Sequence, residues 1–188
     1  MNPLFSDYAT KARWKAITPF VHGNVLDIGC GWTKLPDILT NNQVYVGIDI
    51  ASVVLEYCTK RYPQHTFCYR NLDVEPLALS QYRFNTAIMA AVIEHLQFPQ
   101  CVLRQVRALL ASDGLLIVTT PSPLGNVVHQ IGSRIGLFYP ESVVKHVQIF
   151  GRRALLSALS ECGYQVIHYR VFLMGMNQLV VCRPLSKM

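Results

Sequence analysis

The chain reads Val25-Leu26-Asp27-Ile28-Gly29-Cys30-Gly31-Trp32-Thr33-Lys34 at the point that decides its fold. A strand of buried type runs directly into a glycine turn, and a helix is expected to follow at 33–39. Two glycines let the backbone turn tightly and let a ligand approach the main chain, while the first N–H groups of a helix are free to bind it. The stretch therefore predicts a strand–turn–helix unit that can bind a ligand. A tight turn without a ligand is the plainer alternative.

Around this unit, short runs rich in Val, Ile and Tyr alternate with segments of helical period, which is typical of βα units around a parallel sheet. Strands are expected at 24–28, 44–48, 66–70, 84–90, 115–119, 164–172 and 178–183, and helices at 7–18, 33–39, 51–61, 98–111 and 151–162. In the last two helices the apolar residues form one stripe, and Gly114 and Gly163 are expected to end them. The sequence therefore predicts an α/β protein.

Length and composition fit a single globular domain. The 188 residues are 51% hydrophobic and 15% charged, which excludes disorder and leaves no room for a second domain of ordinary size. No apolar run reaches the roughly 18 residues that would cross a bilayer, and residues 1–15 carry charges of both signs, so neither a signal peptide nor a membrane span is expected. The six cysteines lack the spacing of a zinc site, and reduced thiols in a cytoplasm are expected.

The formal net charge of +6 lies entirely in the C-terminal half. Residues 1–100 carry 8 basic and 8 acidic side chains, whereas residues 101–188 carry 9 basic and 3 acidic ones. Such an asymmetry indicates a surface for an acidic substrate, a nucleic acid or an anionic membrane. A basic surface that only aids solubility is an equal alternative.

Two acidic residues stand at the ends of later strands. Asp49 could accept both hydroxyls of an adenosine ribose, and Asp73 could accept from an adenine amine while the N–H of Val74 donates to a ring nitrogen. A helix cap and a local turn are the plainer roles of the two carboxylates. Lys34 stands where a dinucleotide-binding fingerprint needs a third Gly, which weakens a dehydrogenase interpretation. Since three successive strand ends carry such groups, they point at one crevice.

In the combination of its motifs, segment 24–120 resembles the class I S-adenosylmethionine-dependent methyltransferases, specifically the small-molecule branch that includes the ubiquinone and menaquinone biosynthesis methyltransferases. The matching pieces are Val25 to Gly31, Val46-Gly47-Ile48-Asp49, Asn71-Leu72-Asp73, Ala91-Val92-Ile93-Glu94-His95-Leu96, and Leu109-Leu110 through Asp113-Gly114-Leu115-Leu116-Ile117-Val118. Trp32 and Thr33 depart from the family pattern, in which a Gly is common after the second motif Gly.

This resemblance implies a single-domain Rossmann-like methyltransferase fold, with a seven-stranded, mostly parallel sheet, an antiparallel C-terminal strand and helices on both faces. Within the one domain, 1–188, it implies an N-terminal helical cap at 1–22, a cofactor-binding half at 23–121, an acceptor-binding segment at 122–150, and a last helix with a C-terminal hairpin at 151–188. The segment 122–150 has no sustained period, and connections of that length inside a compact domain are more often functional than neutral.

The resemblance also implies S-adenosylmethionine as the cofactor and no metal. The residues expected around the cofactor are Asp27, Gly29, Cys30, Gly31, Asp49, Ile50, Asp73, Val74, Ala90 and Ala91. By family analogy the two glycines line the methionine part, Asp49 holds the ribose and Asp73 lies by the adenine. Asp27 would orient the turn or reach the methionine amino group through water. Ala90 or Ala91 would form the floor of the site, and Cys30 would contribute only its backbone.

The implied reaction is methyl transfer by in-line displacement to a small-molecule acceptor, anionic or lipid-linked. Positioning alone can supply up to about 7–11 kcal/mol of the barrier reduction, and an oxygen acceptor benefits from a base with a pKa near neutrality. His95 and His146 are therefore the expected catalytic residues, and His129 is a weaker candidate. For His95 a structural role in its loop is the alternative. Tyr8 and Trp14 could cover the cofactor, with core packing as the plainer role.

Two other functions remain open from the sequence. The basic half would suit an RNA or other nucleic-acid methyltransferase, but Ala90-Ala91-Val92-Ile93-Glu94 stands where base-modifying enzymes commonly carry an Asn/Asp-Pro-Pro-aromatic motif. A methyltransferase-like module that binds without turnover is the other alternative. A nucleic-acid partner is not expected, peripheral contact with a membrane stays open, and the sequence does not fix an oligomeric state.

Overall fold

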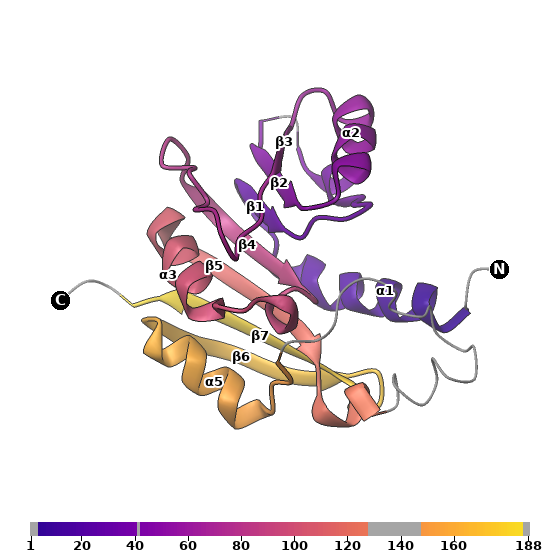
Figure 1. The fold of residues 1–188 in the computed structure, drawn as a ribbon, viewed down its shortest axis with the longest axis vertical. Coiled ribbons are helices and arrows are strands. Elements are labelled where there is room, and N and C mark those ends of the chain that lie inside the picture. The colour runs from indigo at the N-terminus through magenta and orange to yellow at the C-terminus, as the bar shows by residue number, and fades with distance from the viewer. Residues whose placement is uncertain (1–3, 41, 128–147, 186–188) are drawn as a thin grey trace.

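A computed structural model describes residues 4–40, 42–127 and 148–185 of the chain, and seven strands form one sheet in it (Figure 1). The strands are β1 (Val25–Ile28), β2 (Tyr45–Asp49), β3 (Thr66–Tyr69), β4 (Phe84–Ala90), β5 (Leu110–Pro121), β6 (Tyr164–Phe172) and β7 (Asn177–Pro184). Their order is β3-β2-β1-β4-β5-β7-β6. The strands from β3 to β5 pair in parallel, and β7 runs antiparallel to both of its neighbours. The predicted seven-stranded sheet is confirmed.

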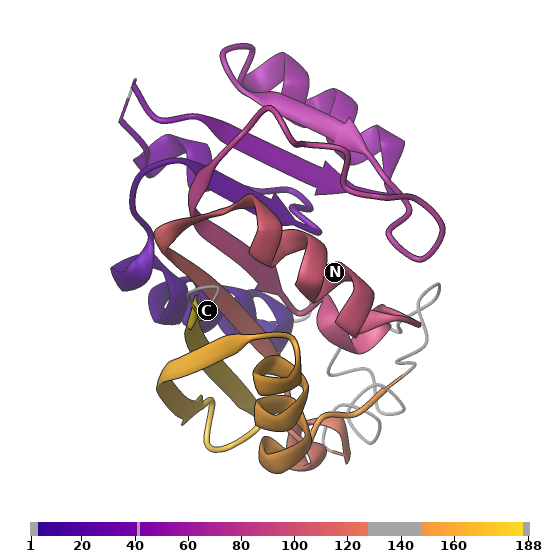
Figure 2. The ribbon, with the colours of Figure 1, turned by 90° about the vertical axis from the view of Figure 1, so that its left-hand side faces the viewer.

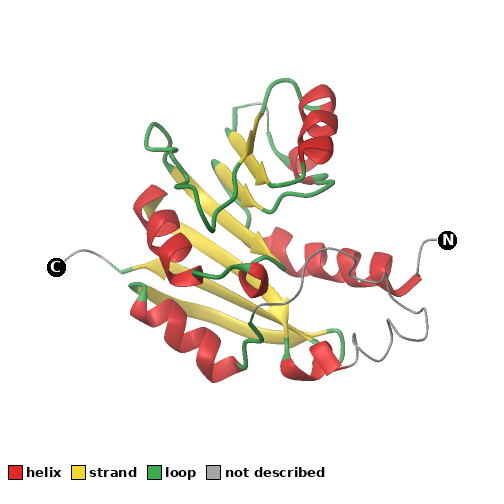
Figure 3. Ribbon diagram, viewed as in Figure 1, coloured by secondary structure: helices red, strands yellow, loops and turns green. Residues whose placement is uncertain are grey.

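Helices cover both faces of this sheet, as predicted. The longer helices are α1 (Leu4–Ile17), α2 (Ser52–Arg61), α3 (Pro99–Leu109) and α5 (Arg152–Glu161), and the single turns of 3-10 helix are η1 (Thr18–Phe20), η2 (Leu35–Ile38) and η3 (Ile93–His95). Helices α3 and α5 pack on one face and α1 on the opposite face (Figure 2). The connection between β3 and β4 is loop throughout (Figure 3).

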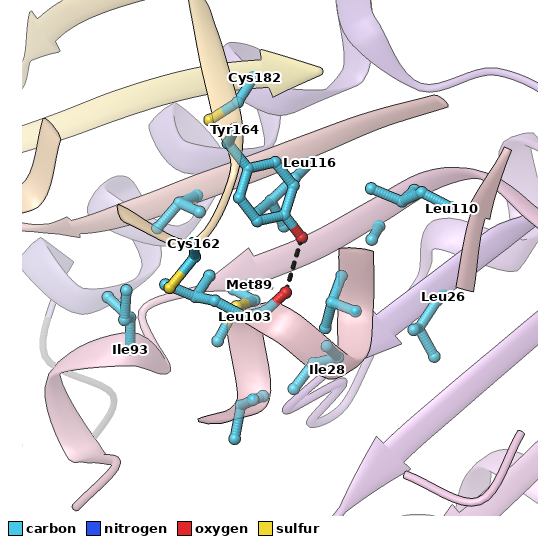
Figure 4. Close-up of a cluster of buried hydrophobic side chains, with 14 of the residues drawn as sticks. Leu26, Ile28, Met89, Ile93, Leu103, Leu110, Leu116, Cys162, Tyr164 and Cys182 are labelled. Carbon is cyan, nitrogen blue, oxygen red and sulfur yellow. Dashed lines mark hydrogen bonds between the residues drawn. The ribbon is translucent and has the colours of Figure 1, made fainter. Parts of the chain in front are cut away.

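Two apolar clusters, one on each face, hold these layers together. Val102 and Val106 of α3 are fully buried with Leu155 and Leu159 of α5 in the larger cluster. Tyr164, on β6, is buried in the same cluster, and its hydroxyl donates a 2.9 Å hydrogen bond to the carbonyl of Leu103 in α3 (Figure 4). The smaller cluster lies under α1 and η2. The apolar stripes predicted for α3 and α5 are confirmed, and Gly163, at φ +79°, ends α5 as predicted.

The predicted helix at 33–39 is wrong, because only the single turn η2 forms there. The backbone turns to an extended conformation at Leu39, whose N–H bonds back to the carbonyl of Pro36. Directly beyond it, the N–H of Thr40 donates a 2.7 Å hydrogen bond to the side-chain oxygen of Gln43. Such side-chain bonds offer the backbone an alternative to helical pairing, so the connection enters β2 by a turn.

The expected role of Gly114 is also wrong. Helix α3 ends at Leu109, and β5 begins at the next residue, so Gly114 lies inside the strand. A Cβ at this position would lie 3.0 Å from the carbonyl oxygens of Ala111 and Phe84. Gly114 is therefore needed for a close approach of backbone at the irregular register between β4 and β5, and it does not end the helix.

Candidate functional site

The glycine turn after β1 is tied to the neighbouring strand β2. The N–H groups of Gly29 and Cys30 donate hydrogen bonds of 2.7 and 3.0 Å to the carbonyl of Ile48. Gly29 and Gly31 have φ values of +69° and +52°, which only glycine adopts without strain. A Cβ on Gly31 would meet no atom within 4 Å, so the main chain borders open space there.

Asp49, at the end of β2, holds the other side of this turn. Its Oδ2 accepts a 2.8 Å hydrogen bond from the N–H of Gly31, and its Oδ1 accepts one of 2.9 Å from the N–H of Ala51, next to α2. Each carboxylate oxygen has two acceptor positions, so the half-buried side chain can still accept two hydroxyls. Asp49 thus bonds to the turn and, as far as the described residues go, keeps acceptor positions open at the edge of the sheet.

Asp27 lies beneath the turn and is fully buried. Its Oδ2 accepts hydrogen bonds from the hydroxyl of Tyr45 at 2.7 Å and from that of Thr33 at 3.4 Å, while Oδ1 has no partner among the described residues. Burial raises the pKa of the Asp27 carboxyl to about 6, and the two hydroxyl bonds offset part of this effect. The Asp27 carboxyl is thus bonded closely to Tyr45 of β2 and, by a longer contact, to Thr33 beyond the glycine turn.

The end of β4 lies beside the glycine turn, on the side away from β2. Ala91 has a positive φ of +59°, and its N–H donates to the carbonyl of Thr119 on β5. The following residue, Val92, packs against the Cα of Gly29, where a Cβ would collide with Cγ2 of the valine. Gly29 is therefore required by the packing of two strand ends, whereas Gly31 faces open space.

Asp73 lies in the loop after β3, where its Oδ1 accepts a 2.8 Å hydrogen bond from the N–H of Gln97 beyond η3. This bond ties the third strand end to the fourth, as a shared crevice requires. The N–H that was expected to meet a ring nitrogen, that of Val74, donates to the carbonyl of Asn71. Ile50, expected beside the cofactor, is 56% exposed next to Asp49.

The two residues after β4 that can carry charge differ in environment. His95 is half-buried at the end of η3, whereas Glu94 is 2% exposed and accepts a 2.9 Å hydrogen bond from the hydroxyl of Thr120. Burial lowers the pKa of Arg13, on α1, and the nearby charge of Glu94 acts in the opposite direction. The sequence analysis did not name Glu94 or Arg13 as site residues, although Glu94 stands next to the predicted site residue His95. His146 and His129 lie outside the described residues.

A groove between α1 and η2 adjoins the glycine turn. Its volume is about 540 Å³, and its walls come from Asp7, Thr10, Lys11, Trp14, Thr18, Trp32, Lys34, Leu35 and Ile38. Trp14, for which core packing was the plainer expectation and covering a cofactor the other, lines the groove and packs against the smaller cluster, whereas Tyr8 is 63% exposed and does not line the groove. The sequence reasoning missed this groove because it expected a helix where η2 lies.

Taken together, these observations define a Rossmann-like α/β protein in which the glycine turn, Asp49 and Asp73 stand at the carboxyl ends of the parallel strands. Within the described ranges, no group of three or more His, Cys, Asp or Glu side chains could hold a metal ion. No helix in that part of the chain is both long enough and apolar enough to cross a membrane.

Residues 7–169 match the methyltransferase domain family, and the chain belongs to this family of class I S-adenosylmethionine-dependent methyltransferases. The chain is similar to a ubiquinone biosynthesis O-methyltransferase of Cereibacter sphaeroides, at 32% identity over 130 residues that cover 64% of this chain and 53% of that protein. A protein of the same name from Haemophilus ducreyi is 29% identical over 129 residues, with 64% and 52% covered. The chain spans about half the length of the curated relatives it matches.

Solved structures share the fold at low identity. An S-adenosylmethionine-dependent methyltransferase from Mesorhizobium loti superimposes with a TM-score of 0.75 at 18% identity, covering 92% of this chain and 97% of that one. A methyltransferase of Haloferax volcanii, in complex with the activator Trm112, gives a TM-score of 0.74 at 11% identity, with 97% and 93% covered. The Rossmann-like methyltransferase fold is therefore confirmed.

Proposed function

We propose that this chain binds S-adenosylmethionine and transfers its methyl group to a small-molecule acceptor. The observation that carries this proposal is the open space over Gly31 beside the carboxylate of Asp49, at the carboxyl ends of adjacent parallel strands. A backbone without side chain and a carboxylate with free acceptor positions suit the methionine and ribose parts of the cofactor.

The residues present fit such a cofactor. Asp49 would hold the ribose hydroxyls, Asp73 would accept from the adenine amine, and Gly31 would let the methionine part approach the main chain. When bound, the cofactor supplies an electrophilic methyl group on a sulfonium, which an acceptor atom takes by in-line displacement. The protein's contribution is mainly orientation and exclusion of water.

The acceptor is expected to be a small molecule that presents an oxygen. This proposal is supported by the similarity to proteins named ubiquinone biosynthesis O-methyltransferase. His95, half-buried just beyond β4, is the proposed base for the acceptor proton. All six cysteines are free thiols, which suits the reducing cytoplasm that the sequence predicts.

Calorimetry with S-adenosylhomocysteine, the demethylated product, tests the proposal. Folded protein is expected to bind it at one site. S-inosylhomocysteine, whose base carries a carbonyl in place of the adenine amine, should bind at least about tenfold more weakly, because Asp73 would lose its donor. Protein that is folded by circular dichroism but binds neither compound would overturn the proposed function. Equal affinity for the two compounds would remove the role of Asp73.

A further inference from the structure

The groove between α1 and η2 lies where a full crossover helix would cover the sheet. Because the connection after β1 forms only the turn η2, the space beside α1 stays open, with a volume of about 540 Å³. Binding sites for small molecules ordinarily measure about 300–1,000 Å³. The groove is therefore large enough for a ligand of its own.

Most of the surface area of the groove's walls is apolar. Leu35, 3% exposed, packs in the cluster under α1, and Trp14 is a partly buried member of the same cluster. Trp32 and Ile38 are large apolar side chains that remain 61% and 59% exposed. An edge contact with Tyr57 of α2, with ring centroids 5.0 Å apart, supports Trp32. A ligand that covers these side chains would remove apolar surface from water.

The charged groups of the groove favour an anion. Lys11 and Lys34 line it, and neither forms an ion pair with a described residue. Asp7 is the acidic side chain of the groove and stands one helical turn from Lys11, which it can partly neutralise. Asp37, near Lys34 in sequence, is held by Arg61 at 3.3 Å. Of these two cations, Lys34 is therefore the one with less acidic neutralisation from the described residues.

The groove also has a direction. Lys34 follows Gly31 by three residues, so its end of the groove adjoins the turn at the carboxyl end of β1. The N-terminal end of α1 lies on the side to which the arrowheads of β4 and β5 point (Figure 1), and Lys11 stands near the middle of that helix. Leu35 and Ile38 continue the groove away from this edge. A cationic end thus faces the crevice, and an apolar channel leads away from it.

We propose that this groove binds an anionic amphiphile, with its charged group at Lys34 and its apolar chain along Trp14, Leu35 and Ile38. In this way it would present the acceptor's head at the crevice, a role that rests on the proposed function. Binding of the amphiphile itself needs no cofactor, so the two proposals can fail separately.

Tryptophan fluorescence tests the proposal directly, because Trp14 and Trp32 are the chain's two tryptophans and both line the groove. Decanoate, titrated at pH 8 below its micelle concentration, is expected to give a saturable change. Lys34→Gln should raise its dissociation constant about three- to fivefold, the range of an exposed charge pair, and leave that of neutral decanol unchanged. Ile38→Asp should weaken both ligands at least about tenfold.

Ile167→Asp is the matched control, since it places the same charge at a half-exposed apolar position on the edge strand β6. It should bind decanoate as the parent does. No saturable change in the parent, or equal binding by Ile38→Asp and Ile167→Asp, would overturn the groove proposal. Calorimetry with S-adenosylhomocysteine on the same samples separates the two proposals: binding of the product without decanoate binding overturns this inference alone.

Discussion

The N–H of Gly31 donates a 2.8 Å hydrogen bond to Oδ2 of Asp49, which joins the turn after β1 to the end of β2 across 18 residues of sequence. The same carboxylate holds the N–H of Ala51 at the entry to α2. One side chain therefore fixes both walls of the open space over Gly31. Its loss should affect ligand binding more than the stability of the sheet.

Asp49→Ala is expected to weaken binding of S-adenosylhomocysteine at least about tenfold, because charge-assisted hydrogen bonds to the ribose are lost and the turn loosens. Calorimetry measures this effect. The control is Asp113→Ala, which removes an exposed carboxylate near the beginning of β5. The 3′-deoxy analogue of S-adenosylhomocysteine separates loss of the ribose contact from loosening of the turn. The natural chain should bind this analogue more weakly than S-adenosylhomocysteine. The Asp49→Ala variant should bind the two ligands equally. An unchanged dissociation constant in Asp49→Ala contradicts the ribose role.

Gly29→Ala should lower the free energy of unfolding by about 2–4 kcal/mol, because the new Cβ is strained at φ +69° and collides with Val92. Urea unfolding measures the change. Adding Val92→Ala should restore the part of the lost unfolding free energy that is due to the collision. The part that is due to backbone strain should remain. Gly151→Ala is the control, since its Cβ would make an ordinary 3.9 Å contact with Pro123, and a change within about 0.5 kcal/mol is expected. Equal effects of the two Gly→Ala substitutions would contradict this account.

The strands could be predicted because their signals are local. Strands β4 and β6 have the predicted bounds, and β1, β2, β3 and β7 differ by one residue at one or both ends. Each is a short run of apolar and β-branched residues that ends at a turn signal. The convergence of Gly31, Asp49 and Asp73 followed from the rule that parallel strands end at one edge.

The predictions that failed concern features that depend on tertiary contacts. Gly114 looks like a helix stop in the sequence, but the approach of Phe84 from β4 requires it. The short turn η2 depends on competition between helical pairing and the bond from Thr40 to Gln43, so periodicity alone could not reveal the groove. Glu94 was missed because a buried carboxylate has no sequence signature until its partner Thr120, 26 residues away, is placed beside it.

Tyr164→Phe should cost about 1 kcal/mol of unfolding free energy, because it removes the buried hydrogen bond that joins β6 to the carbonyl of Leu103. The ring, and thus the apolar packing seen in Figure 4, is kept. Thermal and urea unfolding measure the loss. Tyr69→Phe, at a half-exposed position on the other edge strand β3, is the matched control and should change little. If both variants are as stable as the parent, the bond contributes nothing to holding the C-terminal hairpin on α3.

The buried carboxyl of Asp27 should make stability fall as the pH rises. Its pKa is raised to about 6 by burial, against 3.8 for the ordinary group, so between these values the folded chain keeps a proton that the unfolded chain has lost. The free energy of unfolding should therefore drop by about 1.4 kcal/mol per pH unit there, and by about 3 kcal/mol in all. Urea unfolding from pH 4 to 7.5 measures this. The difference in unfolding free energy between the natural chain and Asp27→Asn at each pH isolates the contribution of Asp27, because the contributions of the other titrating groups cancel.

Tyr45→Phe makes the origin of this pH dependence testable. The hydroxyl of Tyr45 donates to Asp27 Oδ2 and so favours the ionised carboxylate, which lowers the pKa. Without this bond the pKa of Asp27 should rise further, and the fall in stability should extend to a higher pH than in the natural chain. In the double variant with Asp27→Asn the extension should vanish. The difference in unfolding free energy between the natural chain and Asp27→Asn could instead stay constant from pH 4 to 7.5. The Asp27 carboxyl would then have the same pKa in the folded and the unfolded chain. Burial would then not govern its charge.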